Sequence, residues 1–295
     1  MSDSLIIGAG ISGCGAAVQL KKAGIEFVLL DKNRTPGGVI KNAGLINNYP
    51  GFEKPITGID FAKRLENNLR EHNIEIHGET AQKVIREDKG FLVITDKKSY
   101  HCNNLLICWG TTPKKIKFKG VESLVEQGLI FYEVFDLFKK FKQPSRVLIA
   151  GGGEASMDYA LSIVKRGGRA DIICRSEKLK GADTLIEEVN KKPEIRCFYN
   201  TEIDYVSIKS GKIEMIVKKN QSEIRFDKYD AIIGAIGRKS TLTDLLTNIE
   251  IESGILNPQK GLYICGDARK GTLGQLATGA GDGVEAAMHI HSLSR

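Results

Sequence analysis

Two glycine-rich segments carry the clearest chemical signal in this 295-residue sequence. The first, Gly8-Ala9-Gly10-Ile11-Ser12-Gly13, follows an apolar run and opens a run of small residues, and Asp31 ends the next apolar run. Gly8 suits a tight turn, Gly10 allows a pyrophosphate to approach the backbone, and Gly13 allows a helix to pack closely on a strand. The helix N-terminus then faces the phosphates, and the Asp31 carboxylate can accept hydrogen bonds from ribose hydroxyls. We predict a dinucleotide site here; the alternative is a tight turn without a ligand.

The second segment, Gly151-Gly152-Gly153-Glu154-Ala155-Ser156, repeats this pattern with Ser156 as its third small residue. No acidic residue ends the apolar run that follows it. A basic cluster stands there instead: Arg175, Ser176, Lys178 and Lys180, with Glu177 among them. Cations attract a ribose 2′-phosphate that a carboxylate would repel, which favours NADP over NAD. The alternative is a solvated basic loop.

No other spacing of reactive side chains predicts a site. The six cysteines are scattered without a C-x-x-C pair, so we expect reduced thiols in a cytosolic protein and no zinc site. Cys14 is either a reactive thiol, whose pKa the helix N-terminus lowers, or a small packed residue. His289 and His291 would lie on different faces of a helix, so we expect no metal site.

The elements around the two segments define the fold class. Each segment lies between an apolar strand and a helix and leads to a second strand, which makes a βαβ unit. Short alternating segments after each unit suggest β-meanders. They span 74–77, 83–87, 91–95 and 105–109 after the first unit, and 195–199, 205–208, 213–217, 224–226 and 231–236 after the second, with Ser210-Gly211 as a hairpin turn.

We therefore predict an α/β fold of two Rossmann-like dinucleotide-binding domains of the three-layer type, each with a β-meander. The second domain, residues 114–239, is inserted into the first, which comprises residues 1–113 and 240–295. No apolar run reaches the roughly 18 residues of a membrane span. No signal peptide precedes the first strand, so we expect a cytoplasmic protein without membrane contact.

Glycine and charge are both unevenly placed. Glycine supplies 32 of 295 residues. Its clusters, which include Gly279, Gly281 and Gly283, predict a ligand lying against the main chain. Residues 112–240 contain 25 Lys+Arg and 18 Asp+Glu, whereas the remainder contains 18 of each. The inserted domain should therefore attract phosphates or an acidic partner, and its lack of interleaved aromatic residues argues against nucleic acid.

Further motifs extend from residue 5 to about residue 290. They are Pro36-Gly37-Gly38, Asn47-Asn48-Tyr49-Pro50-Gly51-Phe52, Ile107-Cys108-Trp109-Gly110, Gly266-Asp267-Ala268, and the run from Gln275 to Gly283. Together with the two glycine-rich segments, they resemble the low-molecular-weight thioredoxin-reductase-like flavoproteins. That family includes thioredoxin reductases and the thioredoxin-reductase-like ferredoxin–NADP reductases. The resemblance implies FAD in the first domain, NADP in the inserted domain, and a homodimer.

The resemblance also implies roles for single residues. Asp267 would hold the flavin ribityl chain, Asn48 would lie near the isoalloxazine, and the helix that starts at Gln275 would face the flavin pyrimidine. The full set expected at FAD is Gly8, Gly10, Ser12, Gly13, Asp31, Lys32, Gly38, Asn48, Gly110, Gly266, Asp267, Gln275, Leu276 and Ala277. The set expected at NADP is Gly151, Gly153, Glu154, Ala155, Ser156, Arg175, Ser176 and Lys180.

The sequence departs from the thioredoxin reductases where these carry the redox-active C-A-T-C-D. Tyr132 and Phe135 occupy the two cysteine positions, and only Asp136 is retained. No thiol pair can therefore relay two electrons at this point. The segment resembles that of the ferredoxin–NADP reductases, and we expect it near the flavin, where Tyr132 either stacks on the ring system or fills core volume.

We therefore expect an FAD-dependent NAD(P)H oxidoreductase, in which NADPH reduces FAD by hydride transfer. Electrons would pass to an acidic one-electron carrier such as ferredoxin or flavodoxin. Two alternatives stay open: an enzyme that reduces a small disulfide or a quinone, and a flavoprotein that does not use NAD(P)H. No catalytic side chain is assigned, because the cofactors supply the chemistry.

Overall fold

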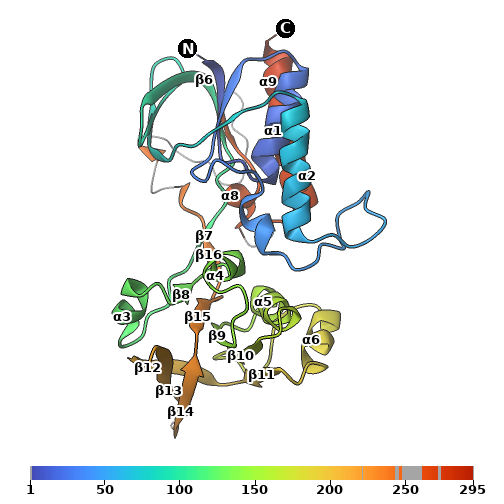
Figure 1. Ribbon diagram of the computed structural model, residues 1–295. Helices are drawn as coiled ribbons and strands as arrows, with labels where there is room; N and C mark the ends of the chain where they lie inside the picture. Colours follow the sequence, from blue (N-terminus) through green and yellow to red (C-terminus); the bar gives the residue numbers. More distant parts are fainter. Residues whose placement is uncertain (1, 221, 243–245, 248–260, 272–273, 295) are drawn as a thin grey trace. The chain divides into compact units, whose positions relative to one another are not determined.

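The computed structural model describes residues 2–220, 222–242, 246–247, 261–271 and 274–294. The chain forms two compact units (Figure 1). The first comprises Met1–Lys41, Leu45–Thr112 and Arg238–Arg295, and the second comprises Asn42–Gly44 and Pro113–Gly237. The chain thus passes between the units at 112/113 and 237/238. The boundaries expected from the sequence, 113/114 and 239/240, are one and two residues later. Two short paired strands occupy these passages, β7 (Thr112–Pro113) and β16 (Arg238–Lys239).

An eight-stranded sheet is the framework of the first unit, with the order β17-β4-β5-β6-β1-β2-β3 and with β18 also paired to β6. Its strands are β1 (Ser2–Ile7), β2 (Phe27–Leu30), β3 (Ile76–His77), β4 (Ala81–Arg86), β5 (Phe91–Thr95), β6 (Ser99–Ile107), β17 (Leu246–Thr247) and β18 (Leu262–Ile264). Strand β6 has two roles. Its first half continues the antiparallel meander β4-β5, and its second half runs parallel to β1 and β18.

Helices cover one face of this sheet. Helices α1 (Ile11–Lys22), α2 (Gly58–Glu71) and α9 (Leu276–Leu293) lie side by side there (Figure 1). The unit also contains the short α8 (Asp267–Lys270), and a 3-10 helix spans Gly38–Asn42. Side chains alternate across β1: Ile6 packs in the core under α1 and α9, and its neighbours Leu5 and Ile7 pack in the core on the other face. Such a strand is buried on both faces and is therefore apolar throughout.

Close packing of α1 on α9 explains part of the glycine pattern. A Cβ on Gly283 would lie 1.9 Å from the Ser12 carbonyl oxygen, and one on Gly279 would lie 3.0 Å from the Ile11 side chain. These two glycines let the helices approach each other. Helix packing thus accounts for Gly279 and Gly283 without a ligand, whereas Gly281 has open space around it among the described residues.

The second unit has a five-stranded parallel sheet with the order β11-β10-β9-β15-β8, and a separate antiparallel meander β12-β13-β14. The sheet strands are β8 (Ile130–Phe131), β9 (Arg146–Ala150), β10 (Arg169–Ile173), β11 (Ile195–Phe198) and β15 (Ala231–Gly234). The meander strands are β12 (Thr201–Lys209), β13 (Lys212–Lys219) and β14 (Ser222–Tyr229). The helices are α3 (Val121–Glu126), α4 (Val134–Lys140), α5 (Glu154–Lys165) and α6 (Asp183–Asn190).

The predicted fold class is confirmed: each unit joins a glycine-rich loop, a parallel sheet, helices and a meander. Some segments belong to a different sheet than expected. Residues 195–199 and 231–236 contribute β11 and β15 to the parallel sheet rather than to the meander, and Ile76–His77 forms the parallel edge strand β3. The hairpin turn at Ser210-Gly211 is present, with φ of 49° and 72° at its two residues.

Candidate functional site

The first glycine-rich loop joins β1 to α1 and is fixed by backbone packing. Gly8 has a φ of 104°, and a Cβ on it would lie 2.5 Å from the Cys108 carbonyl oxygen at the end of β6. A Cβ on Gly13 would lie 1.9 Å from the Gly8 carbonyl oxygen. Both positions therefore require glycine before any ligand binds.

Gly10 differs from its neighbours because it faces open space. The nearest atom to a Cβ built there is the Cys108 carbonyl oxygen at 3.9 Å. Gly10 is also the N-cap of α1, and no side chain caps this helix or places an acid in its first turn. Backbone N–H groups at such a terminus attract anions. The loop thus fits a dinucleotide pyrophosphate.

Two other predicted residues lie beside this loop. The Asp31 carboxylate accepts hydrogen bonds from the Ala9 backbone N–H (3.0 Å, to Oδ2) and the Asn33 backbone N–H (2.8 Å, to Oδ1). A Cβ on Gly38 would have Gly10 as its nearest neighbour, with its Cα 3.9 Å away. Lys32, also expected here, is exposed. Asp31 and Gly38 are therefore brought to the loop from separate parts of the chain.

The C-terminal motifs reach the same loop. Gly266 has a φ of 65°, and a Cβ on it would lie 2.3 Å from Ser12 Oγ in the first turn of α1. Asp267 follows in α8, where burial raises the pKa of its carboxyl group although nearby Arg238 acts to lower it. An aspartate carboxylate at this position can accept hydrogen bonds from the hydroxyl groups of a ligand.

Asn48 and Gln275 meet although 227 positions separate them. Asn48 Nδ2 donates to Gln275 Oε1 at 3.2 Å. Gln275 is the N-cap of α9, and a capping box with Thr278 fixes it there. Leu276 and Ala277 form the first turn. Gly110, the last residue of the FAD set, has a φ of 70° with open space around its Cα.

The second glycine-rich loop joins β9 to α5 in the same geometry. Gly151 has a φ of 144°, and a Cβ on it would lie 2.1 Å from the Ala235 carbonyl oxygen. Gly153, the N-cap of α5, has no atom within 4 Å of a Cβ built there. Ser156 stands where the first loop has Gly13; it is buried, and its Oγ donates to the Gly153 carbonyl oxygen at 2.5 Å. This loop therefore also fits a dinucleotide.

Residues expected around the second loop divide into two groups. Glu154 and Ser176 have structural partners: Glu154 Oε1 accepts from the Ala182 backbone N–H (3.0 Å) at the start of α6, and Ser176 Oγ donates to the Lys178 carbonyl oxygen (2.7 Å). Ala155, Arg175 and Lys180 are exposed. The Lys180 backbone N–H donates to the Gly152 carbonyl oxygen at 2.7 Å, which brings the basic segment over the loop.

We expect Arg175→Ala to raise the KM for NADPH by about tenfold, because a charge-assisted hydrogen bond to the 2′-phosphate would be lost. The KM for NADH should stay within about twofold, since NADH lacks that phosphate. Steady-state kinetics with an artificial acceptor measures both. Lys192→Ala, an exposed cation past the end of α6, is the matched control. An equal change for both nucleotides would remove the phosphate argument.

The segment that replaces the thiol pair packs within the second unit. Tyr132 Cε1 would lie 2.8 Å from a Cβ built on Gly234, and the Tyr132 hydroxyl accepts from the Ile116 backbone N–H at 3.3 Å. Lys115 Nζ lies 4.0 Å from the centre of the Tyr132 ring. These contacts favour the interpretation that Tyr132 fills core volume. Stacking on a flavin stays a prediction.

Phe135 and Asp136 lie in α4. The Phe135 backbone N–H donates to Asn42 Oδ1 at 3.0 Å, and Asp136 Oδ1 forms an ion pair with Lys139 Nζ at 2.7 Å. Asn42 Nδ2 also donates to Glu133 Oε2 at 2.7 Å. These contacts explain why Asn42–Gly44 belongs to the second unit.

The thiols are poorly suited to reaction. Cys14 is 2% exposed and donates to the Ala9 carbonyl oxygen at 3.3 Å. Burial, with a smaller contribution from the Asp31 charge, raises the pKa of the Cys14 thiol to about 12. Its hydrogen-bonded, buried position supports the alternative that Cys14 is a packed residue. A hydrogen bond with Cys265 and burial likewise raise the pKa of Cys108.

Three polar residues around Gly266 and Asp267 are absent from the predicted set: Thr111, Arg238 and Asp282. Arg238 donates to the Thr111 side chain (Nε to Oγ1, 2.8 Å) and to its carbonyl oxygen (2.7 Å), which keeps its charge near Asp267. Asp282 accepts from the Gly266 backbone N–H at 2.8 Å. Asp282 lies in the run Gly-Ala-Gly-Asp-Gly, and this position is the sequence feature from which it could be predicted.

Within the described part of the chain, no group of three or more His, Cys, Asp or Glu side chains is arranged to hold a metal ion. None of the helices described is both long and apolar enough to span a bilayer.

Two Rossmann-like units, each with an open glycine at the N-terminus of a helix, define a protein that binds two dinucleotides. The chain belongs to the pyridine nucleotide-disulphide oxidoreductase family, whose model matches residues 2–283. It is similar to thioredoxin reductase of Bacillus subtilis, with 25% identity over 98% of this chain and 93% of that protein. It is also similar to ferredoxin–NADP reductase of Lactococcus lactis, with 26% identity over 96% of this chain and 92% of that protein.

A solved structure supports the same assignment. Thioredoxin reductase of T. acidophilum superposes with a TM-score of 0.85 at 26% identity, covering 99% of this chain and 98% of that one. The predicted coarser class, a thioredoxin-reductase-like oxidoreductase with FAD and NADP as its cofactors, is thereby confirmed.

Proposed function

We propose that the first unit binds FAD, that the second binds NADPH, and that the protein transfers electrons from NADPH to an acidic one-electron carrier such as ferredoxin or flavodoxin. One observation carries the proposal: two matching loops whose only open positions are Gly10 and Gly153. When bound, FAD accepts a hydride equivalent and can release electrons one at a time.

The residues of the chain would bind and orient the two cofactors. The N-terminus of α1 and the loop Gly8–Gly13 would hold the FAD pyrophosphate, and Asp31 would accept from the adenosine ribose. Asp267 would accept from the ribityl hydroxyls, while the Asn48–Gln275 pair would fix the start of α9 against the ring system. The loop Gly151–Ser156 would hold the NADPH pyrophosphate, and Arg175 and Lys180 would attract the 2′-phosphate.

Two observations support a carrier that is not a dithiol protein. The sequence has no C-x-x-C, and Tyr132 and Phe135 stand where a thiol pair would be needed. A ferredoxin–NADP reductase is among the relatives of similar length. The same relatives include many thioredoxin reductases, so reduction of a small disulfide or a quinone is the second candidate.

The placement of charge supports an acidic partner. Arg175 and Lys180 stand near the Gly153 loop, but six exposed cations, of which Lys191 pairs with Glu187, stand near the amino ends of β9–β11 and the carboxyl ends of α5 and α6. They are Lys142, Lys165, Arg166, Arg169, Lys191 and Lys192. Strand β9 alone separates these ends by roughly 16 Å, so these cations do not serve the nucleotide. Their field can steer an acidic protein.

Anaerobic addition of NADPH should bleach the flavin absorbance of the purified protein, and a protein that keeps its colour would not use NADPH. Ferredoxin reduction should then slow by about 3- to 10-fold from low salt to ~0.15 M, because salt screens the steering field. Reduction of a neutral dye by the same sample is the control and should change little. Bleaching without reduction of ferredoxin or flavodoxin at any ionic strength would leave the small disulfide or quinone as acceptor.

The resemblance to this family also supports a homodimer, and the free cysteines are compatible with a cytoplasmic protein. Sedimentation analysis of the purified protein at micromolar concentration would test the first of these.

A further inference from the structure

Asp282 is a buried carboxylate in α9 that is outside the predicted cofactor sets. Its side chain is 4% exposed. Oδ2 accepts from the Gly266 backbone N–H at 2.8 Å, and Oδ1 accepts from Arg269 Nη2 at 2.5 Å and from Lys270 Nζ at 2.9 Å. One carboxylate therefore contacts both ends of the Gly266–Lys270 turn.

This contact lies against the first glycine-rich loop. A Cβ on Gly266 would meet Ser12 Oγ at 2.3 Å, and a Cβ on Gly283, the residue after Asp282, would meet the Ser12 carbonyl oxygen at 1.9 Å. The turn, α9 and the first turn of α1 therefore pack in van der Waals contact. A displacement of the turn would therefore also displace the residues that are proposed to bind the pyrophosphate and the ribityl chain.

Charge balance gives Asp282 a second effect. Arg269 and Lys270 lie within three residues of Asp267, but both pair with Asp282. Neither Arg269 nor Lys270 forms an ion pair with Asp267 in the described structure. The charge of Arg238 lies near Asp267, and Asp267 Oδ1 faces Gly274. Arg269 Nε is buried and has no hydrogen-bond partner in the described part of the chain, which leaves this guanidinium with capacity for an acceptor. Asp267 is the acidic residue nearest in sequence to both cations. We therefore expect it to attract them if Asp282 is neutral.

We propose that Asp282 is a positioning residue for FAD: it holds the Gly266–Lys270 turn and keeps Arg269 and Lys270 away from the Asp267 carboxylate. This inference rests on the proposed binding of FAD by the first unit. Asp282 would not touch the cofactor; it would act on the position of Asp267 and on which cations reach the Asp267 carboxylate.

Asp282→Asn tests the charge effect, because the amide oxygen can still accept from Gly266 while the ion pairs are lost. We expect FAD to bind about 10- to 100-fold more weakly, measured by the flavin fluorescence of titrated apoprotein. Glu285→Gln, which neutralises an exposed acid one turn further along α9, is the matched control and should bind FAD like the wild type.

A rescue separates positioning from a general loss of structure. Removing the released cations as well, in Asp282→Asn with Arg269→Gln and Lys270→Gln, should return FAD affinity to within about threefold of the wild type. This triple variant removes both half-buried cations that Asp282 pairs with, so it also provides the test if the single variant does not fold. A folded triple variant that binds FAD as weakly as Asp282→Asn would overturn the inference.

Two further results are distinguishable. Equal FAD affinity of Asp282→Asn and wild type would overturn the role of Asp282 and leave the proposed function intact. If neither the wild type nor Glu285→Gln binds FAD, the proposed function fails, and the role of Asp282 fails with it.

Discussion

Replacing Gly10 by alanine should give a folded protein that no longer retains FAD. Gly10 has φ and ψ of −69° and −173°, a conformation that alanine adopts without strain, and a Cβ there would have no protein atom closer than 3.9 Å. The added methyl group would instead enter the space proposed for the pyrophosphate. We expect FAD affinity to fall by about 10- to 100-fold or more, because overpacking by one methyl group costs about 1–3 kcal/mol.

The second unit provides a reciprocal control. Gly153 is the matching position, with φ and ψ of −94° and −179° and no atom within 4 Å of a built Cβ. Gly153→Ala should retain FAD and lose NADPH-driven bleaching, whereas Gly10→Ala should lose FAD with an unchanged unfolding temperature of the apoprotein. Flavin absorbance after gel filtration and circular dichroism provide these measurements. A Gly10→Ala protein that purifies fully loaded would show that FAD binds elsewhere.

Gly13 would be the wrong choice for this experiment. A Cβ at Gly13 would lie 1.9 Å from the Gly8 carbonyl oxygen, so Gly13→Ala would disturb the fold as well as the ligand. The spacing G-x-G-x-x-G predicts a packing role for Gly13 and a place beside the pyrophosphate for Gly10, and the structure agrees that Gly13 is enclosed while Gly10 faces open space.

The two loops and the fold class could be predicted from sequence because they depend on local patterns. A strand, a glycine turn and a helix within about 30 residues form a unit whose geometry is locally determined. Sheet membership could not be predicted in the same way. Residues 231–236 form a short apolar segment, which suits a meander strand and a central parallel strand equally, and only pairing with β9 places them in the parallel sheet.

Sequence patterns are also limited in predicting the contacts of individual residues of the candidate sites. Glu154 and Ser176 stay predictions at the nucleotide, and the structure adds a local hydrogen bond for each that the motif does not predict. The function of Gly283 depends on where α9 packs on α1, which is a contact between distant segments. Asp282 was missed for this reason, because its partners Arg269 and Lys270 are brought to it by the same packing.

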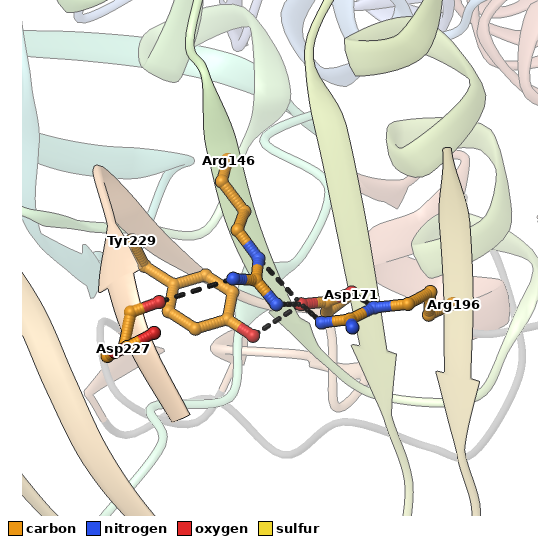
Figure 2. A network of polar contacts seen from close by, with 5 residues as sticks. All are labelled: Arg146, Asp171, Arg196, Asp227 and Tyr229. Carbon is orange, nitrogen blue, oxygen red and sulfur yellow. Dashed lines mark hydrogen bonds and ion pairs between the residues drawn. The ribbon is translucent and has the colours of Figure 1, made fainter. Parts of the chain in front are cut away.

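A buried polar network surrounds Asp171 in the second unit, and removing its carboxylate should destabilise that unit. Asp171, in β10, is 2% exposed and accepts hydrogen bonds from Arg146 in β9, Arg196 in β11 and the Tyr229 hydroxyl in β14 (Figure 2). The Arg146 bonds are 3.0 and 2.8 Å long, and the Arg196 bonds are 2.7 and 2.8 Å long. One carboxylate thus joins three strands of the parallel sheet to the meander.

Asp171→Asn should lower the free energy of unfolding by about 2–3 kcal/mol, because charge-assisted hydrogen bonds are lost while water still solvates the two guanidinium groups, which are 26% and 52% exposed. Urea unfolding followed by circular dichroism measures this change. Glu194→Gln, an exposed acid next to β11, is the control and should change the free energy by less than about 0.5 kcal/mol. The single tryptophan, Trp109, lies in the first unit, so its fluorescence reports whether that unit unfolds separately.

The pH dependence of this effect has a definite sign. Burial alone would raise the pKa of Asp171, but hydrogen bonds from Arg196 and Tyr229 and the charge of Arg146 lower it below its ordinary value of 3.8. The folded protein therefore binds the proton less readily than the unfolded chain, and the stabilisation is complete above pH ~4 and is lost as the pH falls through the lowered pKa. The difference between wild type and Asp171→Asn should thus be constant from about pH 6 to 8 and shrink in acid. A difference below about 1 kcal/mol at pH 7 would mean that the two arginines find other partners and that the carboxylate does not hold the meander to the sheet.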